Sequence, residues 1–199
     1  RIWRVVDRRL GGEQTDKGAI FELLCMPSKK KNVERKEKEE YNNSNIACLL
    51  VEIGWIDPNH EDKVGDNTSM PILCMASTYG RIDIVTTLLD RGADIIQAEN
   101  DGITPLIMAS QKGHVQVVRV LLDRGADINQ ADNNGTTPLF IASQNGHVKV
   151  VRALLERGAD INKGGALGMT PLMMAQRYNH HEVVRLLERA LLKRQSSTK

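Results

Sequence analysis

Apolar positions recur along the chain with a period of 33 residues, and the best-formed unit spans residues 132–164. Within it, one apolar pattern of helical spacing runs through residues 138–145 and a second runs through residues 148–155. Gly158 stops the second pattern, and an extended arm follows. The unit therefore predicts two antiparallel helices that are joined by a tight turn and followed by an arm.

Short-range signals mark the ends of these helices. Thr137 can cap the free N–H groups of the first helix, and Pro138 suits its first turn because proline has no N–H to leave unpaired. Gly146 suits the left-handed position after that helix. Asn134-Gly135 tolerates positive φ and predicts a tight turn ahead of the helix.

The same frame recurs before and after this unit. The residues that coincide at a shift of 33 are Thr104, Thr137 and Thr170; Pro105, Pro138 and Pro171; Ala76, Ala109, Ala142 and Ala175; and Gly92, Gly125 and Gly158. A fixed period of this size indicates a repeat array, in which stacked units share a core that no single unit can form. We expect the small alanines to let neighbouring helices approach closely.

The pattern TPLxxA-xxxGH-xxVVxxLLxxGADIN resembles the ankyrin repeat. It stands as GITPLIMASQKGHVQVVRVLLDRGADIN at residues 102–129 and as GTTPLFIASQNGHVKVVRALLERGADIN at residues 135–162. The resemblance implies an all-α ankyrin-repeat solenoid of stacked helix-turn-helix units with short β-hairpin fingers.

The repeat frame divides the chain into consecutive segments. We expect an N-terminal capping segment at 1–15, a degenerate first repeat at 16–65 with a charged insertion at about 29–44, repeats at 66–98, 99–131 and 132–164, a C-terminal capping repeat at 165–195 and a disordered tail at 196–199.

The outer units depart from the frame. Pro71 stands where other units have Thr, so we expect a weaker helix cap there, and residues 55–67 carry extra positions that lengthen the first finger. In the last unit, Asn179 replaces a Gly and Glu188 replaces an apolar residue. A more polar last helix is what the uncovered end of an array needs.

Bulk composition narrows the function classes. The net charge of +2 and the aromatic content of 4% argue against a dedicated nucleic-acid binder. Cys25, Cys48 and Cys74 are widely spaced, which favours reduced thiols over a disulfide framework or a zinc site. No apolar run reaches the roughly 18 residues that a membrane span needs. Since the chain begins with Arg1 and not Met, we expect a fragment or a processed chain.

The candidate catalytic and metal-binding groups are better explained by the fold. The histidines and aspartates that recur once per unit are His114, His147 and His180, and Asp94, Asp127 and Asp160. Helix-borne metal ligands need a spacing of three or four residues, so we expect the histidines to bond to neighbouring backbone and the aspartates to shape the finger. Lys163-Gly164-Gly165 lacks the ending of a phosphate-binding loop, and we expect a flexible finger tip. We therefore expect no catalytic residue, cofactor or metal.

Residues that vary between units while the frame stays fixed are free to serve a partner. On the ankyrin resemblance they lie at the finger tips and at the exposed end of the first helix, which together form the concave face. The candidate partner-binding residues are Thr78, Tyr79, Asn100, Asp101, Ile103, Gln111, Lys112, Asn133, Asn134, Thr136, Phe140, Gln144, Asn145, Leu167, Met169, Arg177 and Tyr178.

Three apolar residues follow the TPL motif at equivalent places, namely Ile107, Phe140 and Met173. Packing between repeats is the favoured reading of all three. If they are exposed instead, they form an apolar stripe flanked by polar tips, which is typical of a partner groove.

We expect a non-catalytic, monomeric scaffold that binds another protein through its concave face, in the cytoplasm or the nucleus, with no membrane, nucleic-acid or small-molecule partner. An alternative is a targeting or regulatory region of a larger enzyme, effector or channel. A third reading is nucleic-acid binding through residues 29–38 and 185–199.

Overall fold

The computed structural model describes Cys48, Val51, Gly54 and residues 56–64, 68–165 and 168–196. The elements in this part of the chain are β1 (Glu61–Val64), β2 (Thr68–Pro71), α4 (Ile72–Thr78), α5 (Ile82–Asp90), α6 (Pro105–Lys112), α7 (Val115–Asp123), α8 (Pro138–Gln144), α9 (Val148–Glu156), α10 (Pro171–Arg177) and α11 (His181–Ser196). The predicted N-terminal cap, the charged insertion and most of the degenerate first repeat lie outside the described residues.

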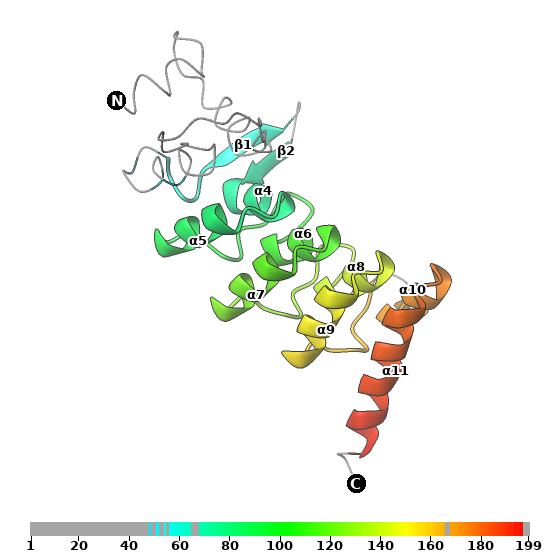
Figure 1. The fold of residues 1–199 in the computed structure, drawn as a ribbon. Helices are drawn as coiled ribbons and strands as arrows, with labels where there is room; N and C mark the ends of the chain where they lie inside the picture. The colour runs from blue at the N-terminus through cyan, green and yellow to red at the C-terminus, as the bar shows by residue number, and fades with distance from the viewer. Residues whose placement is uncertain are drawn as a thin grey trace, which may run out of the picture.

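The helices form two layers that run the length of the stack (Figure 1). Helices α4, α6, α8 and α10 contact one another in that order and make the first layer. Helices α5, α7, α9 and α11 contact one another in the same way and make the second. Each first-layer helix also contacts the second-layer helix that follows it in the chain. This arrangement confirms the predicted all-α solenoid.

The core repeats along the stack as the sequence does. Each second-layer helix buries the same two apolar positions, which are Ile84 and Leu88, Val117 and Leu121, Val150 and Leu154, and Val183 and Leu187. The predicted small position of the first layer is also buried in every unit, at Ala76, Ala109, Ala142 and Ala175. Each junction between the helix pairs from α4 to α11 is therefore closed by the same packing, so truncating one of these leucines to alanine should cost about 2–5 kcal/mol.

The first-layer helices begin as predicted. The hydroxyl oxygens of Thr104, Thr137 and Thr170 accept hydrogen bonds from the backbone N–H three residues on, and a proline follows each threonine. In the second unit Pro71 precedes α4 and makes no side-chain cap bond, which confirms the expected weak cap. Gly146 follows α8 with φ 73°, and Asn179 adopts φ 58° at the equivalent place after α10.

The first finger is a true β-hairpin. Strands β1 and β2 pair antiparallel, with Glu61 opposite Pro71 and Val64 opposite Thr68. The extra positions around residues 55–67 therefore lengthen this finger, as predicted.

The last helix differs from its counterparts. Helix α11 has 16 residues, whereas α5, α7 and α9 have 9 each. Glu188 is exposed on it, in keeping with a polar end of the array. The helix includes Ser196, the first residue of the predicted disordered tail, and the other residues of that predicted tail lie outside the described residues.

Candidate functional site

The fingers of the last three repeats close in the same way. In each, a backbone N–H at the start of the finger donates to a carbonyl oxygen four residues on at 3.1 Å; the pairs are Glu99 with Ile103, Asp132 with Thr136, and Gly165 with Met169. The side chains of Ile103, Thr136 and Met169 are half-buried at the end of this loop. The variable tip residues between the two closing groups are thus held by backbone bonds.

Adjacent fingers are also bonded to each other. The backbone N–H of Asn133 donates to the carbonyl oxygen of Asp101 at 3.0 Å. Its side-chain Nδ2 donates to the carbonyl oxygen of Asn100 at 3.2 Å. Asn133 therefore holds two adjacent fingers together through its backbone and its side chain. Its neighbour Asn134 is exposed, and the side chain of Asn134 makes no hydrogen bond to a described residue.

Two of the fingers differ in how a carboxylate supports them. Asp132 accepts hydrogen bonds at one oxygen from the backbone N–H groups of Asn134, at 2.9 Å, and Thr136, at 2.7 Å. Glu99 occupies the equivalent place one repeat earlier, but its Oε1 is buried with no hydrogen-bond partner. Burial raises the pKa of the Glu99 carboxyl, and the negative charge of Asp101 raises it further.

The ends of the first-layer helices are held by histidines from the next repeat. The imidazole Nε2 donates to a backbone carbonyl 36 residues earlier at 2.8–2.9 Å; the pairs are His114 with Thr78, His147 with Gln111, and His180 with Gln144. The carbonyl oxygen can only accept, so Nε2 carries the hydrogen. This confirms that the recurring histidines bond to backbone, and it makes the ends of α4, α6 and α8 a fixed platform.

One row of candidate residues follows these helices at a step of 33, namely Tyr79, Lys112, Asn145 and Tyr178. All four are exposed, and the two tyrosines expose 46% and 48% of their surface. The Asn145 amide donates to the carbonyl oxygen of Gln111 at 3.0 Å, so it also joins two repeats. The aromatic members of the row lie at its two ends.

A second row lies one residue earlier, at Thr78, Gln111, Gln144 and Arg177. Thr78 is half-buried and its hydroxyl donates to the carbonyl oxygen of Cys74 at 2.9 Å. Gln144 is half-buried, whereas Gln111 and Arg177 are exposed. Their side chains make no hydrogen bond or ion pair within the described residues, and only their backbones are engaged. The amide groups of Gln111 and Gln144 and the guanidinium of Arg177 are therefore available to a partner, whereas the Thr78 hydroxyl is not.

Phe140 does not belong to the exposed surface. Its side chain is 7% exposed, and its ring lies against Gly165, where an added Cβ would come within 2.8 Å of it. Ile107 is 3% exposed, so the favoured reading of packing between repeats holds for both. Met173 at the equivalent place of the last repeat is 49% exposed. The prediction of packing between repeats is therefore wrong for Met173 in the described structure.

Two glycines of the last finger are closely surrounded. An added Cβ on Gly164 would collide with the carbonyl oxygen of Met169. The flexibility of the Lys163-Gly164-Gly165 tip stays a prediction. Both glycines are half-buried and sit where neighbouring groups leave no room for a side chain. Leu167, a candidate contact in this finger, lies outside the described residues.

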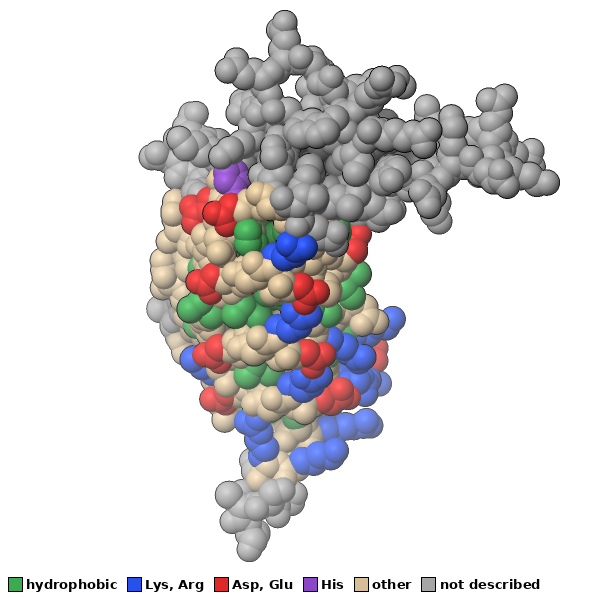
Figure 2. Space-filling view, turned by 90° about the vertical axis from the view of Figure 1, so that its left-hand side faces the viewer, with side chains coloured by type: hydrophobic (Ala, Val, Ile, Leu, Met, Phe, Trp, Pro, Cys, Tyr) green, Lys and Arg blue, Asp and Glu red, His purple; other side chains and the backbone are tan. Residues whose placement is uncertain are grey.

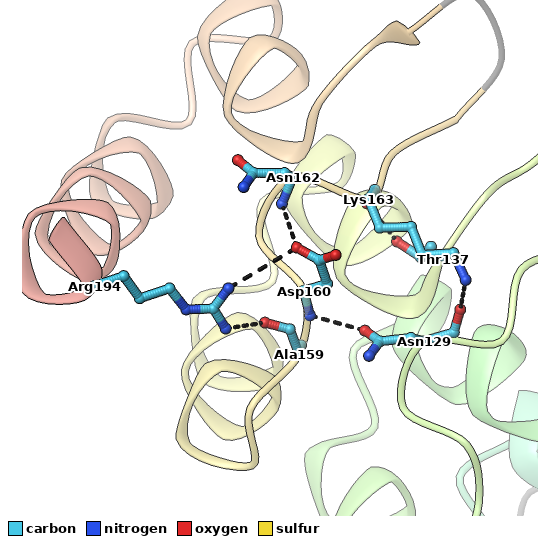
Figure 3. A network of polar contacts seen from close by, with 7 residues as sticks. All are labelled: Asn129, Thr137, Ala159, Asp160, Asn162, Lys163 and Arg194. Carbon is cyan, nitrogen blue, oxygen red and sulfur yellow. Dashed lines mark hydrogen bonds and ion pairs between the residues drawn. The ribbon is translucent and has the colours of Figure 1, made fainter. Parts of the chain in front are cut away.

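The recurring aspartates shape the arms that lead to the fingers, whereas the sequence predicts that they shape the fingers themselves. Each accepts a hydrogen bond from the backbone N–H two residues on; the pairs are Asp94 with Ile96, Asp127 with Asn129, and Asp160 with Asn162. Figure 3 shows how the third of these arms joins three repeats. Asn129 accepts from the backbone N–H of Asp160 at 2.8 Å, and its own carbonyl oxygen accepts from the Lys163 ammonium at 2.9 Å.

The same arm is held at its other side by the last helix. The Arg194 guanidinium donates to the carbonyl oxygen of Ala159 at 2.8 Å and lies 3.9 Å from the Asp160 carboxylate (Figure 3). The Thr137 hydroxyl donates to the carbonyl oxygen of Lys163 at 3.2 Å. The side chains of Arg194 and Thr137 are thus engaged in hydrogen bonds that stabilise the stack.

The remaining chemistry-bearing groups are also explained by packing. Among the described residues, no three His, Cys, Asp or Glu side chains come together as metal ligands could. Cys74 is buried in α4, its thiol donates to the carbonyl oxygen of Gln97, and burial raises its pKa. No helix in the described part of the chain is both long enough and apolar enough to span a bilayer.

Comparison with known proteins agrees with this architecture. The family model described as ankyrin repeats, in three copies, matches the chain at residues 39–132, 73–164 and 130–194. No curated protein matches the chain. Ankyrin repeats generally serve as protein–protein interaction modules and are typically non-catalytic. With its stacked helix pairs, recurring capping threonines and histidine bridges, and with these matches along most of its length, the chain belongs to the ankyrin-repeat family.

Proposed function

We propose that this chain is a non-catalytic scaffold and that it binds a partner protein through its concave face. We define the concave face by the candidate residues that remain after Phe140 is removed, with Met173 added. Those in the described part are Thr78, Tyr79, Asn100, Asp101, Ile103, Gln111, Lys112, Asn133, Asn134, Thr136, Gln144, Asn145, Met169, Met173, Arg177 and Tyr178.

The observation that carries this proposal is the layer of hydrogen bonds beneath the variable side chains. His147 fixes the end of α6 through Gln111, and Asn133 fixes two fingers to each other. The backbone that presents the variable side chains is therefore ordered before a partner arrives. Preorganisation of this kind lowers the entropic cost of association.

The ends of the concave face supply anchors of the type found at protein interfaces. Tyr79 is 46% exposed at one end, and Tyr178 and Met173 are 48% and 49% exposed at the other, next to Arg177. Tyrosine and arginine are enriched among the residues that dominate binding energy. Between them, the ends of α6 and α8 present the amides of Gln111, Gln144 and Asn145 and the ammonium of Lys112. A partner of standard size would cover about 800 Å² on this side.

The proposal that the chain is not a catalyst rests on the hydrogen bonds that its titratable side chains make. The recurring histidines and aspartates that a hydrolytic site would need are bonded to backbone groups of the fold.

We further propose that the scaffold acts as a monomer, because the charged Glu188 stands on the last helix at an apolar position of the other repeats. The buried thiol of Cys74 fits a reducing compartment such as the cytoplasm or the nucleus.

The test is a pull-down with the full chain and with the double variant Tyr79→Glu, Tyr178→Glu. Both residues are exposed, so the variant should keep the helical circular dichroism of the wild type while losing its bound proteins. The matched control is Gln116→Glu, an exposed residue of the second layer whose side chain makes no hydrogen bond within the described residues. If Gln116→Glu loses the same proteins, or if the double variant retains them, the concave face is not the binding site.

A further inference from the structure

The finger that Asp132 and Thr136 close carries an asparagine whose side chain the fold does not use. Asn134 is exposed, and its side-chain amide makes no hydrogen bond to a described residue. Its backbone N–H is held by the Asp132 carboxylate at 2.9 Å. Gly135 follows it with φ 78°. Because glycine has no Cβ, its backbone nitrogen is the least obstructed one that a preceding side chain can meet.

The same repeat contains a second Asn-Gly pair, Asn145 and Gly146, which serves as an internal comparison. Asn145 is also exposed, and Gly146 has φ 73°. In both pairs the glycine N–H donates to a backbone carbonyl oxygen three residues earlier, from Gly135 to Asp132 at 2.9 Å and from Gly146 to Ser143 at 3.3 Å. The backbone nitrogens of the two pairs are therefore restrained in the same way.

The two pairs differ in their contacts with neighbouring repeats. The Asn145 amide donates to the carbonyl oxygen of Gln111 in the preceding repeat at 3.0 Å. The His180 ring of the following repeat lies against Gly146, where an added Cβ would come within 2.5 Å of Nδ1. Both contacts must open before the Asn145 side chain can turn onto the Gly146 nitrogen, which adds to the cost of local opening. The side chain of Asn134 has no such restraint in the described part of the chain.

We propose that Asn134 is a site of spontaneous deamidation in the folded chain and that the stack protects Asn145 from the same reaction. The Gly135 backbone nitrogen, released from Asp132 by local opening, attacks Cγ of the Asn134 side chain. A bond forms between this nitrogen and Cγ, the bond between Cγ and Nδ2 breaks, and Nδ2 leaves as ammonia with the proton of the Gly135 N–H. Water then opens the cyclic imide at either of its two carbonyl groups, which leaves an α-linked or a β-linked aspartyl group.

Both products alter the tip of this finger. Each places a carboxylate where Asn134 had a neutral amide, two residues after the Asp132 carboxylate. The β-linked product also adds a carbon atom to the main chain, which lengthens the turn that the bond from Gly135 to Asp132 closes. The reaction goes beyond the proposed function and does not depend on it.

The charged side of the stack offers no comparable signal. Figure 2 shows Asp and Glu side chains beside Lys and Arg side chains along this side. Two ion pairs cross repeat junctions in the described residues, Arg124 with Asp90 at 2.6 Å and Arg157 with Asp123 at 2.7 Å. Mixed charge of this kind does not select one class of partner, whereas the reaction at Asn134 needs only water.

The test follows the full chain during incubation in mildly alkaline buffer at physiological temperature. Trypsin cleaves after Arg124 and after Lys149, so one peptide, residues 125–149, carries both asparagines. Tandem mass spectrometry assigns the replacement of NH2 by OH to one residue or the other, and a sample without incubation measures deamidation during digestion. In the folded chain Asn134 should convert about tenfold faster than Asn145. In urea the two rates should become similar, because the contacts with neighbouring repeats are gone.

A variant tests the origin of the protection. His180→Ala removes the ring that lies against Gly146, so it should accelerate conversion of Asn145 and leave that of Asn134 unchanged. The matched control is His181→Ala, an exposed neighbour whose side chain makes no hydrogen bond within the described residues, and it should change neither rate.

The wild-type chain alone can overturn the proposal, whatever the stability of the variants. It is overturned if Asn145 converts as fast as Asn134 in the folded chain, or if Asn134 converts in urea but not in the folded chain. An unchanged rate at Asn145 in folded His180→Ala would overturn the role of the ring in the protection.

Discussion

The imidazole Nε2 of His147 donates to the carbonyl oxygen of Gln111 at 2.8 Å. The same ring lies against Gly113, where an added Cβ would come within 2.7 Å of Nδ1. One contact is thus a hydrogen bond and the other a close approach that only glycine allows. Because Gln111 is also a candidate binding residue, the junction between two repeats and the platform for a partner are the same structure.

The first prediction concerns Gly113→Ala. Gly113 has φ 79°, which alanine adopts at a cost of roughly 1–2 kcal/mol, and the new methyl group must also displace the His147 ring from its hydrogen bond, worth about 1 kcal/mol more. We expect a total loss of about 2–3 kcal/mol in urea unfolding followed by circular dichroism.

The matched control for this variant is Gly125→Ala. Gly125 has φ 92°, and an added Cβ there meets nothing within 4 Å, so only the backbone cost of roughly 1–2 kcal/mol should appear. In a His147→Ala background the excess cost of Gly113→Ala should vanish. Equal losses for the two glycine variants in the wild-type background would show that the ring contact is unimportant.

The sequence predicts most of this junction because the signals are local or periodic. Thr137-Pro138 marks the start of α8 through a side-chain cap and a missing N–H, both of which act within one turn. The histidines recur once every 33 residues, so they lack the three- or four-residue spacing of helix-borne metal ligands, and a bond to backbone is the remaining prediction. The period shows that these histidines have a structural role. It does not show that the carbonyl oxygen that accepts each bond lies 36 residues earlier.

The sequence could not predict contacts between repeats where the side chains differ from those at the equivalent positions of other units. Phe140 varies between units as a binding residue would, yet its ring is covered because glycine at position 165 leaves room for it. The contact of Arg194 with Ala159 depends on the extra length of α11, for which the other repeats give no template. Such contacts need the three-dimensional spacing of neighbouring units.

A second prediction separates the two hydrogen bonds of Thr137. Its hydroxyl accepts from the Phe140 N–H at 3.2 Å and donates to the Lys163 carbonyl oxygen at 3.2 Å, in a side chain that is 1% exposed. Thr137→Val keeps the shape and removes both bonds, so we expect a loss of about 2 kcal/mol in the free energy of unfolding.

Thr170→Val is the comparison for that variant. Thr170 caps α10 by accepting from the Met173 N–H at 3.3 Å and is half-exposed, so its loss should be about 1 kcal/mol. If Thr170→Val costs as much as Thr137→Val, the bond to Lys163 contributes nothing measurable.

A third prediction concerns Glu99→Asp, which should give the buried carboxylate in the finger of the third repeat hydrogen-bond partners. In Glu99→Asp the shorter side chain can accept from the backbone N–H groups of Asp101 and Ile103, as Asp132 does from Asn134 and Thr136 one repeat later. We expect the variant to gain about 1 kcal/mol in urea unfolding. A loss of stability would mean that the two fingers have different backbone geometry.

The buried carboxyl of Glu99 also predicts a dependence on pH. Its pKa is raised in the folded chain by burial and by Asp101, so the folded state binds the proton more tightly than the unfolded state. The contribution to stability is complete below the ordinary pKa of glutamate and is lost as pH rises through the folded pKa. We therefore expect Glu99→Gln to gain stability relative to the wild type as pH rises above the ordinary pKa of glutamate, about 4.3. Glu156→Gln, which removes one exposed carboxylate, corrects for the change in net charge, and a difference that stays flat as pH rises would contradict the prediction.

The last prediction concerns the end of the array. Arg194 donates to the carbonyl oxygen of Ala159 at 2.8 Å and lies 3.9 Å from the Asp160 carboxylate, so it ties the final turns of α11 to the preceding repeat. The side chain is half-exposed, and solvent screening limits the expected cost of Arg194→Ala to about 1 kcal/mol. The effect should be local, because the bond holds only the last turns of α11. Hydrogen exchange should accelerate at the amides of residues 191–194 and remain unchanged in α9. Arg189→Ala, five residues earlier in α11 and without an ion pair in the described part of the chain, should leave these amides as they are. Equal acceleration in both variants would mean that the last turns of α11 are held by helix propensity alone and not by the contact with Ala159.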